Sequence, residues 1–314
     1  MPQNNFDVII IGLGPAGMTA AIYCARKGLR TLILGKELGG QVAKTGVVEN
    51  YLGFGQSTGL DLTRQFDNHV ESFKNIKHLH DVNVINLLIN YEFTNKVKNF
   101  KIITDKKKEY KTKAVIICSG RNPKKLNIPG EEKFRAKGVS YCEVCDAPIF
   151  KDQITAVIGG GNSALEAALS LAVLCPKVYI LNINPNLTGD KVSQDKIKEH
   201  KNIEVINNAQ ILEILGSKFV TGLKYKHLKL NIIKNLKVAG IFIEIGWEPA
   251  ISLDKVTKKD KWNQIIIDKQ CQTNVPGIFA AGDVTDIGFY QIIVAAGEGA
   301  KAALATYQYL SKNK

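Results

Sequence analysis

Long apolar runs, a leader-like N-terminus and abundant cysteine are all missing from this sequence of 314 residues. No uninterrupted apolar stretch approaches the roughly 20 residues that a membrane helix requires. The opening MPQNNFDVIII has no basic segment followed by an apolar stretch of signal-peptide length. Six cysteines are too few for a domain built on a disulfide framework. These absences predict a cytoplasmic protein that does not associate with membranes.

Cysteine is present in two settings. Four cysteines lie singly, mostly among apolar neighbours, which indicates core packing: Cys24, Cys118, Cys175 and Cys271. The other two, Cys142 and Cys145, form a CxxC pair followed directly by Asp146. In a reducing compartment this pair is the one cysteine constellation that calls for a chemical explanation.

The charge balance is one-sided, because the formal net charge is +13. The lysines are spread widely, and the densest runs, at 105–113 and 256–262, contain acidic residues as well. This pattern favours a solvated lysine-rich surface, with an acidic protein partner or a nucleic acid as the alternatives. We expect no nucleic-acid partner.

Glycine is plentiful, with 27 residues, and two glycine patterns organise the chain. After the apolar run that begins at Asp7, Gly12, Gly14 and Gly17 form GxGxxG before a helix rich in small residues. Such a turn lets the backbone approach a pyrophosphate at a helix N-terminus. A second unit repeats the arrangement with Gly159-x-Gly161-x-x-Ala164. Two such units predict an α/β protein with two nucleotide-binding folds.

Two further turns belong to this plan. The strand-like segment 113–118 ends at Ser119 and Gly120, just before the second nucleotide fold. Near the C-terminus another strand enters a turn at Gly282 and Asp283, and a helix with small residues on one side follows. An aspartate at that position is well placed to meet a ribityl hydroxyl and a pyrophosphate.

In this order the motifs GxGPAG, GGQ…VENYLGF (39–54), CxxCD, GGGNSALE (159–166) and AAGDV (280–284) resemble the low-molecular-weight thioredoxin reductases. They also resemble the flavoprotein subunit of alkyl hydroperoxide reductase. The resemblance implies two Rossmann-like, three-layer ββα nucleotide-binding domains, the second inserted in the first. Residues 1–117 and 246–314 would form an FAD-binding domain, and 118–245 an NAD(P)-binding domain that carries the redox pair.

The resemblance also implies which residues bind the cofactors. For FAD it implies Gly12, Gly14, Pro15, Ala16, Gly17, Glu37, Gly40, Gln41, Asn50, Val84, Ser119, Gly120, Gly282, Asp283, Gln291 and Ile292. For the nicotinamide nucleotide it implies Gly159, Gly161, Asn162, Ser163, Ala164 and Glu166, with Asn182 at the place of the residue that selects between NADH and NADPH.

Three interpretations compete for the CxxC pair. A zinc site needs further ligands, and the histidines at 78, 80 and 200 form no ligand-like pair with the cysteines, so no metal site is predicted. An idle thiol pair is the second interpretation. A redox dithiol is favoured, since one thiolate attacks a substrate disulfide and the other resolves the mixed disulfide.

By resemblance, Cys145 is the sulfur near the flavin and Cys142 the one that attacks the partner protein. Asp146 resembles the acid that protonates the departing thiolate. A cap of a helix or turn is the alternative role for Asp146.

The segment after the second glycine turn, YILNINPNLTGDK, is the basis for predicting the electron donor. It lacks the arginine pair with which NADPH-using relatives hold the 2′-phosphate. We therefore expect that NADPH is not preferred over NADH. Reduced ferredoxin or a reduced deazaflavin is the alternative donor.

These features predict an FAD-dependent disulfide reductase for thioredoxin or a thioredoxin-like redox protein, and the resemblance implies a homodimer. A reductase of a peroxiredoxin system, using NADH, is a close alternative. A flavin ferredoxin-NADP reductase would lack the dithiol, and a non-enzymatic redox sensor would lack a working donor site.

Overall fold

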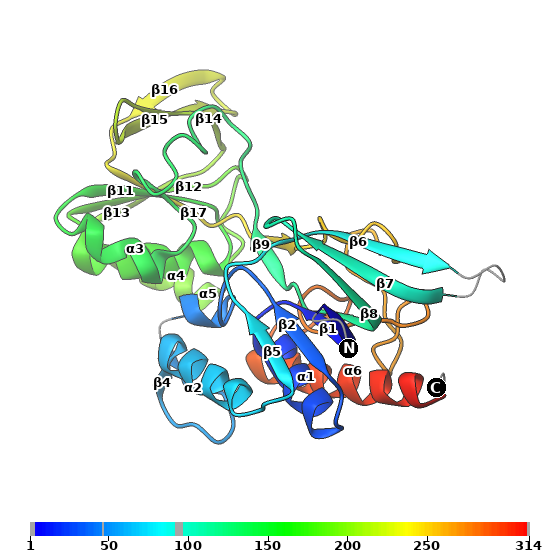
Figure 1. Cartoon of the computed structure of the whole chain (residues 1–314). Coiled ribbons are helices and arrows are strands. Elements are labelled where there is room, and N and C mark those ends of the chain that lie inside the picture. Colours follow the sequence, from blue (N-terminus) through cyan, green and yellow to red (C-terminus); the bar gives the residue numbers. More distant parts are fainter. Residues whose placement is uncertain (1–3, 46, 92–96, 313–314) are drawn as a thin grey trace. The chain divides into compact units, whose positions relative to one another are not determined.

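In the computed structural model, which describes residues 4–45, 47–91 and 97–312, the chain divides into two compact units (Figure 1). The first unit combines Met1–Asn122 with Glu248–Lys314, and the second comprises Pro123–Trp247. These boundaries lie a few residues after the predicted ones. The second unit is therefore inserted into the first.

The first unit is built around a largely parallel sheet. The strands of this sheet are β1 (Asn5–Ile11), β2 (Thr31–Leu34), β5 (Ile76–Leu79), β6 (Val84–Tyr91), β7 (Val97–Thr104), β8 (Glu109–Ile117) and β19 (Ile278–Ala280). The short strands β3 (Val47–Val48) and β4 (Ser57–Thr58) pair separately. Its helices are α1 (Pro15–Arg26), the 3-10 helix η1 (Val42–Lys44), α2 (Gly59–Glu71) and α6 (Ile292–Lys312). The strand order is β5-β2-β1-β8-β7-β6, and β19 also pairs with β8.

Successive side chains of β1 point to opposite faces of the sheet, and both faces are covered. Val8 and Ile10 belong to a buried cluster with the small residues of α1 and α6, which lie together on one side of the sheet (Figure 1). Ile9 and Ile11 point to the opposite face, where they pack with residues of β7 such as Phe100. The period of two in a strand therefore produces three layers: helices, parallel sheet, and the antiparallel strands β6 and β7.

The second unit repeats this plan. Its strands are β10 (Val139–Ser140), β11 (Ile154–Ile158), β12 (Lys177–Leu181), β13 (Ile203–Ile206), β14 (Ala209–Gly216), β15 (Val220–His227), β16 (Ile232–Leu236) and β17 (Gly240–Ile243). Its helices are α3 (Glu143–Asp146), the 3-10 helix η2 (Ala147–Phe150), α4 (Asn162–Leu174) and α5 (Lys191–Glu199). A parallel sheet, β10-β17-β11-β12-β13, accompanies an antiparallel one, β14-β15-β16.

Packing in the second unit follows the same alternation. Val157 of β11 faces the cluster formed with α4. Ala156 and Ile158 face the cluster formed with β14 and β15, so the parallel sheet lies between helices and a second sheet (Figure 1). The predicted α/β class, with a Rossmann-like parallel sheet in each unit, is confirmed.

Two short strands carry the chain from one unit to the other and back. β9 (Arg121–Pro123) and β18 (Trp247–Pro249) pair with each other. On the side of the second unit, the Lys124 amide donates to the Gly246 carbonyl, with 2.9 Å between nitrogen and oxygen. On the side of the first unit, the Ala250 amide donates to the Gly120 carbonyl at the same distance.

Through the described part of the chain, no helix is both long enough and apolar enough to cross a membrane.

Candidate functional site

The first glycine turn joins β1 to α1 in a conformation that only glycine adopts easily. Gly12 has a φ of +123°, and a Cβ there would collide with the Cys118 carbonyl. Gly14 caps α1 without a side chain, and a Cβ on it would meet nothing nearer than 3.9 Å. The turn therefore presents an open cradle at a helix N-terminus, where an anionic group is stabilised.

The second glycine turn has the same construction between β11 and α4. Gly159 has a φ of +142°, and a Cβ there would collide with the Glu244 carbonyl. Gly161 caps α4, and the nearest atom to a Cβ on it would be Thr188 Oγ1 at 3.9 Å. Ala164 is fully buried one turn further on, where only a small residue fits between helix and strand. Each unit thus has one open phosphate-type cradle.

Residues far apart in sequence gather beside the first turn. Gly40 lies next to Gly14, because a Cβ on Gly40 would be 3.7 Å from the Gly14 Cα. Gly282 has a φ of +76°, and its Cβ would lie 3.0 Å from the side chain of Ala16. The turn that carries Asp283 therefore borders the N-terminus of α1.

Two hydrogen bonds join the predicted flavin-side residues in pairs. Gln41 Nε2 donates to Asp283 Oδ2 at 3.5 Å, and Asn50 Nδ2 donates to Gln291 Oε1 at 3.2 Å. Burial raises the pKa of Asp283, although the Arg121 guanidinium and the Gln41 bond act in the opposite direction. Each bond thus links the N-terminal part of the first unit to its C-terminal part.

The remaining predicted residues of this unit have structural contacts of their own. Glu37 forms an ion pair with Lys44. Ser119 Oγ donates to the Ala250 carbonyl at 2.7 Å, so its hydroxyl helps to hold the crossing segments together. Val84 is buried at the start of β6, and Ile292 packs at the start of α6 against the small cluster of Val42, Val48 and Leu62.

The CxxC pair lies at the start of α3 in the second unit. Cys142 and Cys145 form a disulfide. The Cys142 sulfur accepts a hydrogen bond from the Cys145 amide at 3.3 Å, so the helix begins directly at the redox pair. Cys145 is exposed and Cys142 is half-buried. Neither cysteine is therefore enclosed in the core of the second unit.

Ser140, which the sequence reasoning did not single out, ties Asp146 to the disulfide. Its hydroxyl donates to Asp146 Oδ2 at 2.6 Å and accepts from the Cys142 amide at 3.0 Å. Asp146 precedes η2 but makes no side-chain capping bond there, so the alternative role as a cap is not realised. The signal in the sequence was a small hydroxyl residue at the end of a strand, two positions before the first cysteine.

Three carboxyl groups from separate elements of the second unit interact near the nucleotide turn and α3. Burial raises the pKa of Glu244 to about 7, and repulsion from Glu143 and Glu166 adds to the effect. Burial also raises the pKa of Glu143, with a further contribution from Glu166. Glu143 and Glu244 were not predicted, because nothing local in the sequence indicates that these acids meet.

The Asn182 side chain forms its hydrogen bonds with neighbouring loop residues. It is 1% exposed, and its amide nitrogen donates to the carbonyls of Asn184 and Asn186 and to Asn207 Oδ1. Its amide oxygen accepts from the Asn184 amide. The side chain therefore shapes the loop after β12, at the place where the resemblance puts the residue that selects between NADH and NADPH.

An acid that the sequence reasoning missed lies at the second cradle instead. Asn162, the first residue of α4, donates from Nδ2 to Asp190 Oδ2 at 2.8 Å and accepts from the Asp190 amide at 2.6 Å. The Thr188 and Gly189 amides both donate to the Gly160 carbonyl, which holds this loop against the turn. Asp190 therefore places a carboxylate at the edge of the cradle, while Ser163 and Glu166 are exposed on the first turn and a half of α4.

Two open glycine cradles, one in each α/β unit, together with a disulfide-forming CxxC pair are typical of the dinucleotide-dependent disulfide oxidoreductases. Residues 6–299 match the family described as pyridine nucleotide-disulphide oxidoreductase. The chain belongs to this family, and membership implies FAD and a pyridine nucleotide as cofactors. The open space at Gly14 and Gly161 fits their pyrophosphates.

Individual relatives show how far the similarity extends. The chain is 40% identical to an alkyl hydroperoxide reductase subunit of Escherichia coli and 38% identical to an NADH dehydrogenase of Bacillus subtilis, in each case over 99% of this chain and 60% of the relative. The chain thus spans about 60% of the length of these curated relatives. It also resembles the structure of Lactococcus lactis thioredoxin reductase, with 37% identity, a TM-score of 0.85, and coverage of 98% of this chain and 99% of that one.

Proposed function

We propose that the protein reduces the disulfide of a small redox protein of the thioredoxin type, with electrons that pass from a reduced nicotinamide through FAD to the Cys142–Cys145 pair. The observation that carries this proposal is the disulfide at the start of α3. The Ser140 hydroxyl links it by hydrogen bonds to the Asp146 carboxyl group. Similarity to the L. lactis thioredoxin reductase supports the choice of acceptor.

FAD bound in the first unit would supply the two electrons that convert the Cys142–Cys145 disulfide to a dithiol. The residues predicted to hold it are those around the first cradle, above all Gly12, Gly14 and Asp283. The second cradle, with Gly159 and Gly161, would hold the pyrophosphate of the nicotinamide nucleotide. The assignment of one cofactor to each unit is part of this proposal.

The reduced pair then exchanges with the acceptor. The Cys142 thiolate attacks one sulfur of the acceptor disulfide, that S–S bond breaks, and a mixed disulfide forms. Cys145 attacks the Cys142 sulfur, which restores the intramolecular disulfide and releases the acceptor as a dithiol. Two protons are needed by the two departing thiolates.

Local contacts suit this chemistry. The Cys145 amide, which donates to the Cys142 sulfur, stabilises a thiolate there because a charged acceptor strengthens the bond. Asp146 is the proposed proton donor to a departing thiolate, and the Ser140 hydroxyl holds its carboxyl beside the pair.

Single cysteine variants test the proposal. We expect Cys142→Ser and Cys145→Ser each to abolish nucleotide-dependent reduction of thioredoxin by the flavin-loaded protein. Cys142→Ser leaves Cys145 free to form a thiolate–flavin charge-transfer band, whereas Cys145→Ser does not. Val144→Ala, an exposed position between the two cysteines, is the matched control and should retain activity. Native rates in both cysteine variants would disprove the dithiol mechanism.

A peroxiredoxin-system reductase is the second candidate, favoured by the identity to the E. coli alkyl hydroperoxide reductase. The same assay separates the two when thioredoxin is replaced by a peroxiredoxin with its disulfide carrier domain. Faster turnover with that acceptor than with thioredoxin would favour the second candidate.

A further inference from the structure

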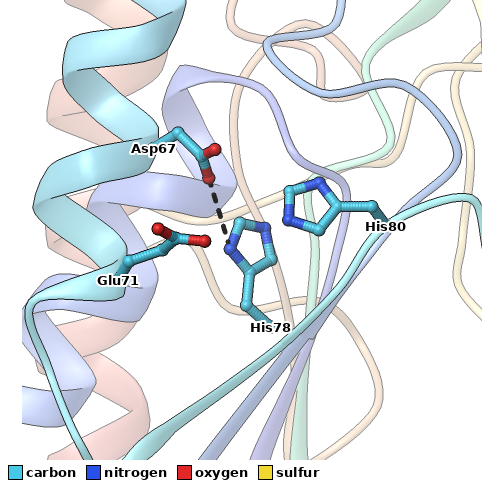
Figure 2. Close-up of side chains that lie close together, drawn as sticks. All are labelled: Asp67, Glu71, His78 and His80. Atoms are coloured by element: carbon cyan, nitrogen blue, oxygen red, sulfur yellow. Dashed lines mark ion pairs between the residues drawn. The ribbon is translucent and has the colours of Figure 1, made fainter.

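Four metal-ligating side chains meet in the first unit, between α2 and the edge strand β5 (Figure 2). Asp67 and Glu71 are four residues apart on α2 and therefore share one face of the helix. His78 belongs to β5 and His80 follows it, so the two rings share one face of the extended segment. One ligand atom from each residue lies within 4.8 Å of the others.

His78 is the member of this cluster that most needs a partner. Its side chain is only 8% exposed, and neither ring nitrogen has a hydrogen-bond partner among the described residues. Asp67 Oδ1 is also buried without a hydrogen bond, 3.3 Å from His78 Nδ1. Figure 2 shows both groups directed into the space that Glu71 and His80 border. Buried polar atoms without partners are costly, so this arrangement points to a ligand between them.

The donor set, and the spacing of one pair within it, match a transition-metal ion. Two ligands on a tetrahedral zinc, each at about 2.0–2.1 Å, are about 3.3 Å apart, which is the separation of His78 Nδ1 and Asp67 Oδ1. Imidazole nitrogens favour zinc and its neighbours over magnesium or calcium. Two carboxylates and two neutral imidazoles would also balance the charge of a divalent ion. Glu71 is exposed, so an ion could enter from solvent.

We propose that Asp67, Glu71, His78 and His80 bind a divalent transition-metal ion of the zinc type, which joins the C-terminal part of α2 to β5. The site is separate from the Cys142–Cys145 pair, which belongs to the second unit. It also departs from the sequence-based expectation of no metal site, which rested on the distance of these histidines from the cysteines. The ion would stabilise the folded first unit, because it binds only where helix and strand are assembled.

The test uses the flavin-loaded, chelator-treated protein with the disulfide oxidised and no thiol reductant present, so that Cys142 and Cys145 cannot bind metal. Zn²⁺ is titrated in competition with a chromophoric chelator, and thermal unfolding is measured with and without Zn²⁺. Co²⁺ serves as a second probe, because its visible bands report histidine and carboxylate ligation. Mg²⁺ is the negative control for a general cation effect.

Glu71→Gln and His80→Gln remove one ligand each and keep the side-chain size, at positions that are less buried than His78. His69→Gln changes an exposed histidine on the same helix, outside the cluster, and is the matched control. We expect one Zn²⁺ per chain and a higher Tm with Zn²⁺ in the wild type and in His69→Gln. Affinity should fall at least tenfold in Glu71→Gln and His80→Gln. Absence of binding in the wild type, or equal affinity in all four proteins, would overturn the proposal and leave His78 and Asp67 as a plain ion pair.

Discussion

At the scale of single residues, Glu244 has a carboxyl group whose pKa burial raises to about 7, from an ordinary value of 4.5. Between these two values the folded state keeps a proton that the unfolded state has lost. The free energy of unfolding therefore falls as the pH rises through this window. Above pH 7 the folded protein contains a half-buried carboxylate that is repelled by two other acids.

Glu244→Gln should remove this pH dependence. The amide cannot ionise, so we expect the variant to gain stability relative to the wild type as the pH rises from about 4.5 to 8, by about 1–3 kcal/mol at the upper end. Urea unfolding of the oxidised protein at several pH values measures the difference. Glu248→Gln, an exposed position four residues on, is the control. A pH-independent difference between Glu244→Gln and the wild type would contradict the assignment.

Residues with a local reason for their type could be anticipated from the sequence. Gly12 and Gly159 are required by a positive φ, and Gly14 and Gly161 by their position at a helix start, which are rules that act within a few residues. Ser140 belongs to the same class of local feature but was hidden, because a serine near a strand end has many other uses. Local rules thus predict the glycine turns, but they do not identify side chains such as Ser140 that position the reactive groups.

At the scale of elements, we expect the loop after β12 to determine which nucleotide the second cradle binds. Two lysines of the following helix α5, Lys191 and Lys198, both form ion pairs with Asp195, at 3.3 Å and 2.8 Å between nitrogen and oxygen. Asp190 adds a carboxylate beside Asn162 at the cradle. The loop thus contributes a negative charge next to the cradle, and two lysines of α5 are held by a neighbouring acid.

We therefore expect a catalytic efficiency with NADH at least equal to that with NADPH. Asp190→Asn removes the repelling charge and keeps the size of the side chain, so it should raise the efficiency with NADPH relative to NADH. Steady-state kinetics with both nucleotides measure this ratio, with Asp152→Asn, in an exposed turn of the same unit, as the control. An efficiency with NADPH about tenfold above NADH, or about 1.4 kcal/mol, would contradict the expectation. Poor activity with both would direct attention to ferredoxin or a reduced deazaflavin.

The four proposed metal ligands show why contacts between elements are harder to predict from the sequence than the elements themselves. Asp67 with Glu71, and His78 with His80, each have the spacing that places both side chains on one face. That α2 lies over the edge strand β5 is a tertiary fact with no mark in either segment. The same reason explains why the meeting of Glu143, Glu166 and Glu244 was not anticipated.

At the scale of the whole molecule, the α/β class and the two nucleotide-type units follow from two repeated strand-turn-helix patterns. The antiparallel layers, β6 with β7 and β14 to β16, were less visible, because their alternating residues also occur in exposed loops. The insertion of one unit into the other followed from the family resemblance and the crossing at Ser119–Gly120. The unit boundaries at residues 122 and 247 depend on where contacts separate, which the sequence alone does not mark.

The paired crossing strands also make the chain modular. Because Lys124 and Gly246 are hydrogen-bonded, the two ends of the inserted unit start side by side, and each buried cluster lies within one unit. Excision of residues 123–247, with a short glycine-containing turn joining Asn122 to Glu248, should leave a self-folding remainder that still takes up FAD. Flavin absorbance and cooperative thermal unfolding of the shortened chain measure this. Loss of both would mean that the two units fold only together, whereas success would make the second unit an exchangeable cassette for grafting other disulfide chemistry onto the same flavin scaffold.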